Sequence, residues 1–353
     1  MTDYEHALGV VNAIDAKIYK DQKAGQSDND PRFYCGASAI GTECARARWY
    51  DFRWATDVKY EARMLRLFDR GHGEEYRVMQ WLGLIGVEIR ATSQRLLYHD
   101  GSDSYILGDW DVDYDAGPDT PDDVTDLPWH VERAKARGLE LKQWSFKAHG
   151  GHFSGHTDAK LRFVPGQDRY VPADEWIIFE CKTHNAKSFA DIAGTRKDRE
   201  KWKVDPVKYP FPGKGVRLAK PEHVVQSQHY MHHLGARLAL YVAVNKDDDD
   251  IHVEFLPYEE RYHIEGEPII RETVHSPRHP RRISSSPSWY KCKGFCDHWE
   301  TCHNGKPMRK SCRTCGHSMA VDGGNWICTK WNNAVIPREA QLVGCGSWLE
   351  IKD

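Results

Sequence analysis

The most constraining stretch of the sequence is a short apolar run that ends in charged residues. Residues 176–179 read Trp-Ile-Ile-Phe, and residues 180–182 read Glu-Cys-Lys. Because side chains of a strand alternate between its two faces, this run predicts a strand buried on both faces, as in the middle of a sheet. The same alternation puts Glu180 and Lys182 on one face and Cys181 on the other. A charge at the end of such a strand needs an ionic partner or a metal ion.

A carboxylate in the preceding strand-like segment can join this pair. Asp158 follows Gly-His-Thr within residues 153–164, so Asp158, Glu180 and Lys182 meet at one point if the two strands pair. Two carboxylates offer the oxygen ligands of Mg²⁺ or Mn²⁺, and such an ion activates water and neutralises charge at a phosphodiester. The lysine can orient that water, lower its pKa or stabilise the transition state. The alternative is a surface strand whose charges face solvent.

Hydrophobic periodicity and turn residues predict an alternation of helices and strands, which indicates the α/β class. Helices are expected at about residues 3–20, 38–50, 58–84 and 221–234, and strands at 141–147, 153–164, 176–182, 238–244 and 251–256. Gly71 and Gly73 are expected to interrupt the third helix.

Capping and breaking residues set several boundaries. Ser38 is a candidate N-cap for the second helix. Pro221 and Gly235 are expected to begin and end the fourth. Residues 183–220 are basic and rich in proline and glycine, so they are expected to be mostly loop, and the aspartate-rich residues 100–126 are expected to form a loop or insertion.

The charge of the whole chain does not by itself indicate nucleic acid: 49 Lys+Arg against 52 Asp+Glu give a net −3 over 353 residues. The distribution is uneven, because residues 182–220 contain eleven bases and four acids, a local +7, whereas residues 100–126 contain ten aspartates and no Lys or Arg. The basic segment is compatible with a phosphate-binding track and equally with a solvated surface.

No membrane or secretory segment is expected. No apolar run reaches the roughly 18 residues that span a bilayer, and the acidic start of the chain lacks a signal pattern. We therefore expect a cytoplasmic protein, in the host cytoplasm if phage-encoded. In a reducing compartment, ten cysteines favour metal binding over disulfides.

Four motifs in a fixed order resemble a known enzyme family. They are, in chain order, His72 and Glu75 in GHGEE, Asp158 in GHTD, Glu180-Cys181-Lys182, and Gln226 with Tyr230 in QSQHY. The set resembles the RecB-like branch of the PD-(D/E)XK nucleases, which includes recombination exonucleases, CRISPR-adaptation nucleases and phage exonucleases.

The resemblance implies a restriction-endonuclease-like central mixed sheet flanked by helices, and a role for each motif residue. Asp158 and Glu180, with His72, would bind the divalent metal ion, assisted by the Cys181 carbonyl. Lys182 would be the catalytic base or electrophile. The spacing favours Glu75 over Glu74 as the acid of the helix, and Gln226 and Tyr230, four apart on one helical face, would lie beside the active site near DNA.

The late cysteines form two sets. Cys292, Cys296 and Cys302 resemble the three late cysteines that, in iron–sulfur members of the branch, join an early cysteine to bind a [4Fe–4S] cluster; Cys44 occupies the early position. This chain has one extra residue between the first two late cysteines, and the alternative is zinc bound by those three with His303.

The second set is typical of a structural zinc ribbon. Cys312 and Cys315 form a C-x₂-C knuckle, and Cys328 and Cys345 follow. Such an ion gives a short segment with little core of its own a reason to fold. Cys35 is expected to bind no metal.

These observations predict the following organisation: N-terminal helices at 1–55, a nuclease core at 56–274, a linker at 275–289 and a cysteine-rich metal-binding domain at 290–353. The predicted activity is Mg²⁺- or Mn²⁺-dependent hydrolysis of DNA, by an exonuclease of phage or bacterial recombination, with recombination or replication proteins as possible partners. Two alternatives remain, a non-catalytic nucleic-acid-binding or assembly protein on a nuclease scaffold, and a site-specific endonuclease.

Overall fold

The computed structural model divides the chain into two compact units, which are described separately. Unit 1 contains Met1–Arg70, Lys147–Ser154 and Ile264–Asp353, and unit 2 contains Gly71–Phe146 and Gly155–His263. The structure describes residues 11–17, 32–57, 60–90, 95–99, 104–108, 144–163, 171 and 175–351, with the backbone alone for 95–99 and 104–108. Within these parts, every helix is too short or too polar to cross a membrane.

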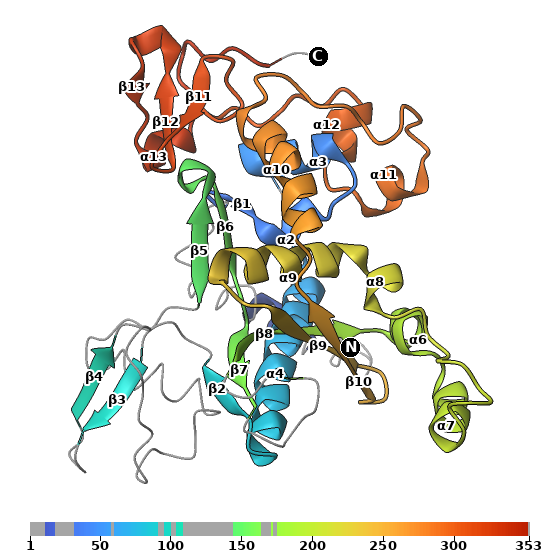
Figure 1. Ribbon diagram of the computed structural model, residues 1–353. Helices are drawn as coiled ribbons and strands as arrows, with labels where there is room; N and C mark the ends of the chain where they lie inside the picture. The colour runs from blue at the N-terminus through green and yellow to red at the C-terminus, as the bar shows by residue number, and fades with distance from the viewer. Residues whose placement is uncertain are drawn as a thin grey trace. The chain divides into compact units, whose positions relative to one another are not determined.

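Unit 2 is built on a mixed five-stranded sheet with strand order β10-β9-β8-β7-β2 (Figure 1). The strands are β2 (Glu88–Arg90), β7 (Ala159–Arg162), β8 (Trp176–His184), β9 (Leu238–Asn245) and β10 (Ile251–Pro257). β8 and β9 are parallel, and the other neighbouring pairs are antiparallel. The α/β class and the mixed sheet flanked by helices are therefore confirmed.

The two faces of β8 have different surroundings, as the alternation predicts. Ile177, Phe179 and Cys181 are fully buried in an apolar cluster that includes Val78 and Met79 of the helix α4 (Ala62–Leu84). Burial on this side stabilises the sheet by about 25 cal/mol per Å² of apolar surface removed from water. The opposite face presents Glu180 to the helix α9 (Pro221–Leu234).

Helix α9 begins and ends as predicted. Pro221 occupies its first turn, where a missing N–H costs nothing. Gly235 follows in the left-handed conformation (φ 69°) and donates its N–H to the Met231 carbonyl, which terminates the helix.

The expected interruption of α4 is wrong. The helix is continuous through Gly71 and Gly73. Each glycine costs a helix about 1 kcal/mol relative to alanine, and the burial of Val78 and Met79 outweighs that cost.

The loop predicted for residues 183–220 is also wrong over much of its length. It contains α6 (Ala186–Ala193), α7 (Arg196–Val204) and α8 (Val216–Ala219). Asn185 and Thr195 are N-caps, because their side-chain oxygens accept hydrogen bonds from the backbone N–H groups of Ser188 and Asp198. These caps, and not the overall composition, decide the local structure.

Several predicted strands differ from the observed ones in where they begin, end or divide. The segment predicted as one strand at 153–164 divides into β6 (Phe153–His156) and β7, and the strand expected at 141–147 is β5 (Ser145–Ala148). A hairpin of β3 (Arg95–His99) and β4 (Ser104–Gly108) enters the aspartate-rich segment, so that segment is not all loop. Its residues 109–126 lie outside the described parts of the chain, as do residues 3–10 and 18–20 of the first predicted helix, whereas 11–17 are helical.

Unit 1 combines short helices with small sheets. Its elements include β1 (Cys35–Gly36), α2 (Ala37–Ile40), α3 (Ala45–Arg53), α10 (Glu260–His275, shared with unit 2), α11 (Tyr290–Phe295), α12 (Trp299–His303), β11 (Ser318–Val321), β12 (Asn325–Cys328), β13 (Ala334–Val335) and α13 (Arg338–Gln341). The predicted N-cap at Ser38 is wrong, because α2 ends at Gly41 and a new helix, α3, is capped by Cys44.

The core of unit 1 is organised around a buried guanidinium. Arg313 has no exposed surface, and its nitrogens donate to the carbonyls of Phe33 (2.9 Å) and Phe52 (3.0 Å) and to Gln341 Oε1 (3.1 Å). Its cation also lies over the Trp54 ring, 3.9 Å from the centroid. These hydrogen bonds satisfy the buried guanidinium and connect the segment around Phe33 and Phe52 to the cysteine-rich part of the chain.

Candidate active site and cysteine clusters

The break between β6 and β7 puts Asp158 beside Cys181 of β8. Buried Thr157 donates its N–H to the Trp144 carbonyl (3.0 Å) and its hydroxyl to the Phe179 carbonyl (3.0 Å). This fixes the next residue, so that Asp158 Oδ2 accepts the backbone N–H of Cys181 at 2.9 Å. The Asp158 carboxylate therefore lies next to Cys181, the residue between Glu180 and Lys182.

Glu180 is a fully buried carboxylate with one engaged oxygen. Its Oε1 accepts a hydrogen bond from Gln226 Nε2 at 2.9 Å and pairs with the Lys182 ammonium. Among the residues that the structure describes, its Oε2 has no hydrogen-bond partner. Burial raises the pKa of Glu180 to about 7, against the lowering effect of Lys182.

Lys182 completes the group on the same face of β8. Its Nζ pairs with Glu180 and also donates to the Cys181 carbonyl at 3.3 Å. Burial acts to lower the pKa of this ammonium, but the charges of Glu180 and Asp158 more than offset it, and the pKa is raised well above its usual value. The side chain keeps 27% of its surface exposed, so a ligand can reach it from solvent.

The two acids of the GHGEE motif have different environments. The pKa of Glu75 is raised to about 8, first by burial and then by the negative charge of Asp158, so Glu75 belongs to the same electrostatic cluster. Glu74 is buried elsewhere and accepts two hydrogen bonds from Arg77 Nη1, at 3.0 and 3.2 Å. His72 is exposed, one turn before Glu75 on α4.

Gln226 and Tyr230 share the face of α9 that covers Glu180. Gln226 Nε2 donates both to Glu180 Oε1 and to the Tyr230 hydroxyl, at 2.9 and 2.8 Å. Tyr230 is 4% exposed, and burial raises its pKa far beyond the physiological range, so its hydroxyl stays protonated. The pair fixes the orientation of one Glu180 oxygen and leaves the other to a ligand.

The donor set suits a hard divalent cation. Besides burial, the negative charge of Asp158 raises the pKa of both Glu75 and Glu180, and a cation would relieve that repulsion. The partnerless Glu180 Oε2 is the oxygen such an ion would take. The ligand oxygens of these three acids are not all within 4.8 Å of one another, so binding requires the side chains to approach.

A second layer behind the site was missed at the sequence level. The Tyr241 hydroxyl, on the strand beside Glu180, bonds to His184 Nε2 at 3.0 Å and to His223 Nδ1 at 2.8 Å. Burial lowers the pKa of His184 to about 4 and of His223 to about 3, so both imidazoles are neutral. Alternation along β8 could have found His184, because it is on the same face as Lys182; Tyr241 depends on the register with β9.

Much of the basic charge of segment 182–220 is compensated inside unit 2. Asp250 accepts hydrogen bonds from both Arg196 and Arg199. Arg217 pairs with Glu259, which also lies outside the segment, whereas Lys201–Asp198 and Lys214–Asp191 are ion pairs within it. The excess of bases in the sequence therefore overstates the positive charge that this surface offers to a phosphate backbone.

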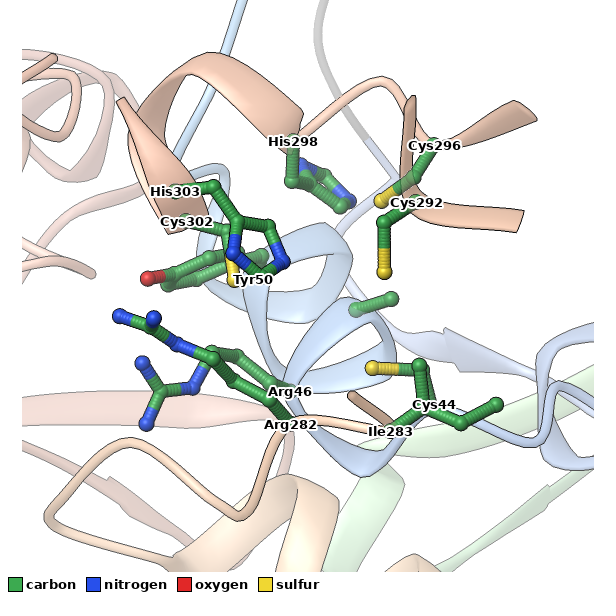
Figure 2. Close-up of a pocket in the computed structure, with 11 residues that line it drawn as sticks. Cys44, Arg46, Tyr50, Arg282, Ile283, Cys292, Cys296, His298, Cys302 and His303 are labelled. Atoms are coloured by element: carbon green, nitrogen blue, oxygen red, sulfur yellow. The ribbon is translucent and has the colours of Figure 1, made fainter. Parts of the chain in front are cut away.

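The first cysteine set surrounds one small cavity of about 10 Å³ in unit 1. Figure 2 shows Cys44, at the start of α3, facing Cys292, Cys296 and Cys302 of the α11–α12 region. The pKa of Cys296 is raised to about 11, first by burial and then by the charges of the other three thiolates, against the lowering effect of a backbone hydrogen bond with His298.

His303 also lines this cavity, so the zinc alternative keeps its fourth ligand. No three of the ligand atoms lie within 4.8 Å of one another, whereas a tetrahedral zinc needs sulfurs about 3.8 Å apart. A four-iron cluster binds each thiolate to a different iron and therefore accepts wider spacing.

The second cysteine set lines a separate hollow of about 230 Å³ in unit 1. Cys312 and Cys315 form a tight turn, with the Cys315 N–H donating to the Cys312 carbonyl at 3.1 Å, and Cys328 ends β12. Cys345 closes the group, and burial followed by its charge raises the pKa of Cys312 to about 11. These sulfurs too must approach one another to bind zinc. Cys35 and Cys181 are buried and line neither of these two cavities.

Comparison with known proteins gives weak similarities. No protein-family model matches the chain, and no curated protein matches it. The solved structure of SSO0001 is similar at 12% identity, over 81% of this chain and 94% of that chain, with a TM-score of 0.39.

Two of the similar solved structures are exonucleases. LHK-Exo in complex with dAMP, an alkaline exonuclease from Laribacter hongkongensis, is 12% identical over 69% of this chain and 86% of that chain, with a TM-score of 0.33. The phage-related exonuclease from Haemophilus somnus 129PT is 15% identical over 42% of this chain and 66% of that chain, with a TM-score of 0.23. At these scores, the function proposed below rests on the geometry of the chain's own residues.

Proposed function

We propose that this protein is a metal-dependent DNA nuclease, specifically an exonuclease of phage or bacterial recombination or DNA processing. The observation that carries the proposal is that Asp158, Glu180 and Lys182 lie together around Cys181 of the central strand β8, with Glu75 in the same electrostatic cluster. The order of its motifs, which resembles that of the RecB-like nucleases, supports the same reading and makes DNA the proposed substrate.

Three carboxylates, Glu75, Asp158 and Glu180, would bind one Mg²⁺ or Mn²⁺, with His72 and the Cys181 carbonyl as further candidate ligands. Such an ion supplies Lewis-acid chemistry, because it lowers the pKa of bound water and neutralises charge on the phosphodiester. Gln226 orients Glu180, and Tyr230 in turn accepts a hydrogen bond from Gln226. Second-layer contacts of this kind fix the geometry of a ligand.

Lys182 acts on the water or on the phosphate. Its ammonium is next to Glu180 and is partly open to solvent, so it can orient the attacking water or stabilise the charge that develops on the phosphorus oxygens. An ammonium that is paired with Glu180 and whose pKa is raised by the charges of Glu180 and Asp158 serves as an electrophile more readily than as a base.

The decisive experiment is DNA degradation by the purified chain with Mg²⁺ or Mn²⁺, on linear and circular DNA of the same sequence. We expect degradation of linear DNA only, abolished by Asp158→Asn, which keeps the shape of the side chain but removes the negative charge. Asp248→Asn, at an exposed turn of the same unit, is the matched control and should retain activity. Salt-sensitive DNA binding without cleavage in any divalent metal would instead support the non-catalytic alternative.

We propose further that Cys44, Cys292, Cys296 and Cys302 bind a [4Fe–4S] cluster, and that Cys312, Cys315, Cys328 and Cys345 bind zinc. The presence of four cysteines around one cavity supports the cluster, and His303 at the same cavity keeps zinc as the alternative. Metal analysis of anaerobically purified protein should give iron, with a visible absorption band that is lost on oxidation, and Cys312→Ser should contain one zinc fewer than wild type. The absence of iron, together with one zinc fewer in Cys292→Ser than in wild type, would assign zinc to the first set.

A further inference from the structure

A third group of potential metal ligands lies in unit 2, apart from the carboxylates and the cysteines. In the described parts of the chain, one set of three His, Cys, Asp or Glu side chains has ligand atoms that all lie within 4.8 Å of one another, and it is His229, His233 and His263. His229 is buried, and the other two are partly exposed, so solvent and a small ion can reach the group.

The positions of these histidines in the sequence suit an ion. His229 and His233 are four apart on α9, so their side chains lie on one face, one turn apart. A pair at this spacing on a helix is the arrangement that binds zinc in helical metal sites. His263, in the first turn of α10, supplies the third imidazole from a second element.

Contacts around the histidines fix the two elements relative to each other within unit 2. Gln228 of α9 donates to the Pro257 carbonyl (2.8 Å) and accepts the Glu259 N–H (2.7 Å), at the turn that leads into α10. His232 Nδ1 bonds to the Tyr258 hydroxyl at 2.7 Å. The backbone of α9 and the start of α10 are therefore held in place without help from an ion.

The rings of the group are stacked as well. His263 stacks on His232 with centroids 3.5 Å apart, and His233 stacks on Phe146 at 4.1 Å. Ring stacking limits the rotamers of both imidazoles, so less conformational entropy is lost when they bind a ligand.

We propose that His229, His233 and His263 bind one Zn²⁺ ion, with water in the fourth position. Imidazole nitrogens suit zinc, and three histidines with one open position are a known tetrahedral set. Zinc–nitrogen bonds of about 2.0–2.1 Å require nitrogens about 3.4 Å apart, so the rings move together on binding.

The proposed ion would stabilise the part of α9 that serves the candidate active site. Gln226, His229, Tyr230 and His233 follow the spacing of one helical stripe, and Phe146 contacts both Tyr230 and His233. The zinc site therefore acts as a structural link between α9 and α10. It does not depend on the nuclease function, because none of its ligands belongs to the carboxylate group.

Zinc content at equilibrium tests the proposal. The full chain, as purified with its cysteine-bound metals, is dialysed against micromolar free Zn²⁺ and its metals are counted per chain. Wild type should contain one zinc more than His233→Gln or His263→Gln. The matched control is His252→Gln, on β10 of the same unit, which should keep the full count. Two independent variants are used so that the result stands if one of them fails to fold, as judged by circular dichroism.

Cobalt distinguishes imidazole from thiolate ligands. With Co²⁺ in place of free zinc, the wild-type minus His263→Gln difference spectrum should show visible ligand-field bands without the near-ultraviolet thiolate charge-transfer band. Equal zinc counts and a flat difference spectrum in folded variants would overturn the proposal and leave the histidines as a packing cluster. A difference spectrum with thiolate bands would overturn it too, because it would assign the lost metal to cysteines.

Discussion

At the scale of single residues, the two carboxylate oxygens of Glu180 have different hydrogen-bonding environments. One accepts hydrogen bonds and an ion pair, and the other has no hydrogen-bond partner within the described chain. A buried carboxylate oxygen left in this state costs free energy unless a ligand compensates it. In the candidate site, the protein thus provides partners for one oxygen of Glu180 and leaves the other oxygen available to a ligand.

Gln226 tests that arrangement directly. Gln226→Leu removes the amide that donates to Glu180 and to Tyr230 while keeping a side chain of similar size. We expect nuclease activity to fall by about 10- to 100-fold, as is typical when a residue that orients a metal ligand is lost. The measurement is the Mn²⁺ dependence of the cleavage rate, which should shift to higher concentration. Glu222→Gln, in the first turn of the same helix, should change neither; equal losses in both variants would mean that α9 is merely destabilised.

The sequence predicts some of these residues better than others. Alternation along one strand is enough to group Glu180 with Lys182, and helical spacing is enough to group Gln226 with Tyr230. Tyr241 could not be found this way, because its place beside Glu180 depends on the parallel register of β8 and β9, some sixty residues apart in the chain. The histidine group of α9 and α10 depends on a tertiary contact for the same reason.

At the scale of elements, capping residues determine where helices begin in segments whose composition alone would predict a loop. The helices α6 and α7 form in a segment whose proline and glycine content favours loops, because Asn185 and Thr195 each satisfy a backbone donor at a helix start. Helix α9 was predicted correctly because proline and glycine mark both of its ends. Helix ends are predicted well where a single proline or glycine marks them. They are predicted poorly where a capping residue lies in a segment whose composition favours loops.

The histidines that bond to Tyr241 join β8, β9 and α9, and they make these elements sensitive to pH. The pKa of His184 is about 4 in the folded state and near 6.5 when unfolded, so between these values the unfolded chain binds more protons. Stability should therefore fall as the pH drops from about 6.5 toward 4, by up to about 3 kcal/mol for this group. Lys182, Lys220 and Lys246 oppose protonation of His184.

Urea unfolding at pH 7 and pH 5 measures this effect, followed by a signal from unit 2. His184→Gln should lose part of the difference in unfolding free energy between the two pH values. Tyr241→Phe removes the shared hydroxyl but keeps both histidines buried, so it should lower stability at both pH values and retain the difference. An unchanged pH difference in His184→Gln would exclude this imidazole as its source.

At the scale of the whole molecule, the two kinds of proposed metal site belong to different units. The carboxylate and histidine groups lie in unit 2, and both cysteine sets lie in unit 1. The units interleave along the chain, since β1 at Cys35 pairs with β6 at Phe153 and Arg313 bonds to the Phe52 carbonyl. The domain boundaries predicted after residues 55, 274 and 289 remain predictions. Contacts between residues more than a hundred positions apart leave no local signal in the sequence, so units made of several chain segments could not be predicted from it.

Removing one thiolate should therefore loosen unit 1 without affecting the five-stranded sheet of unit 2. Cys44→Ser takes away the proposed ligand on α3 that faces α11 and α12, so the proposed cluster should be lost and the segments that it joins should open more often. Hydrogen exchange followed by mass spectrometry should show faster exchange at residues 45–53 and 290–303, and unchanged exchange in β8 and β9. Cys35→Ser alters a buried thiol outside both sets, so it should keep its iron and leave α11 and α12 protected. If both variants exchange alike, the protection of α11 and α12 comes from packing, and the four thiols do not bind a common group.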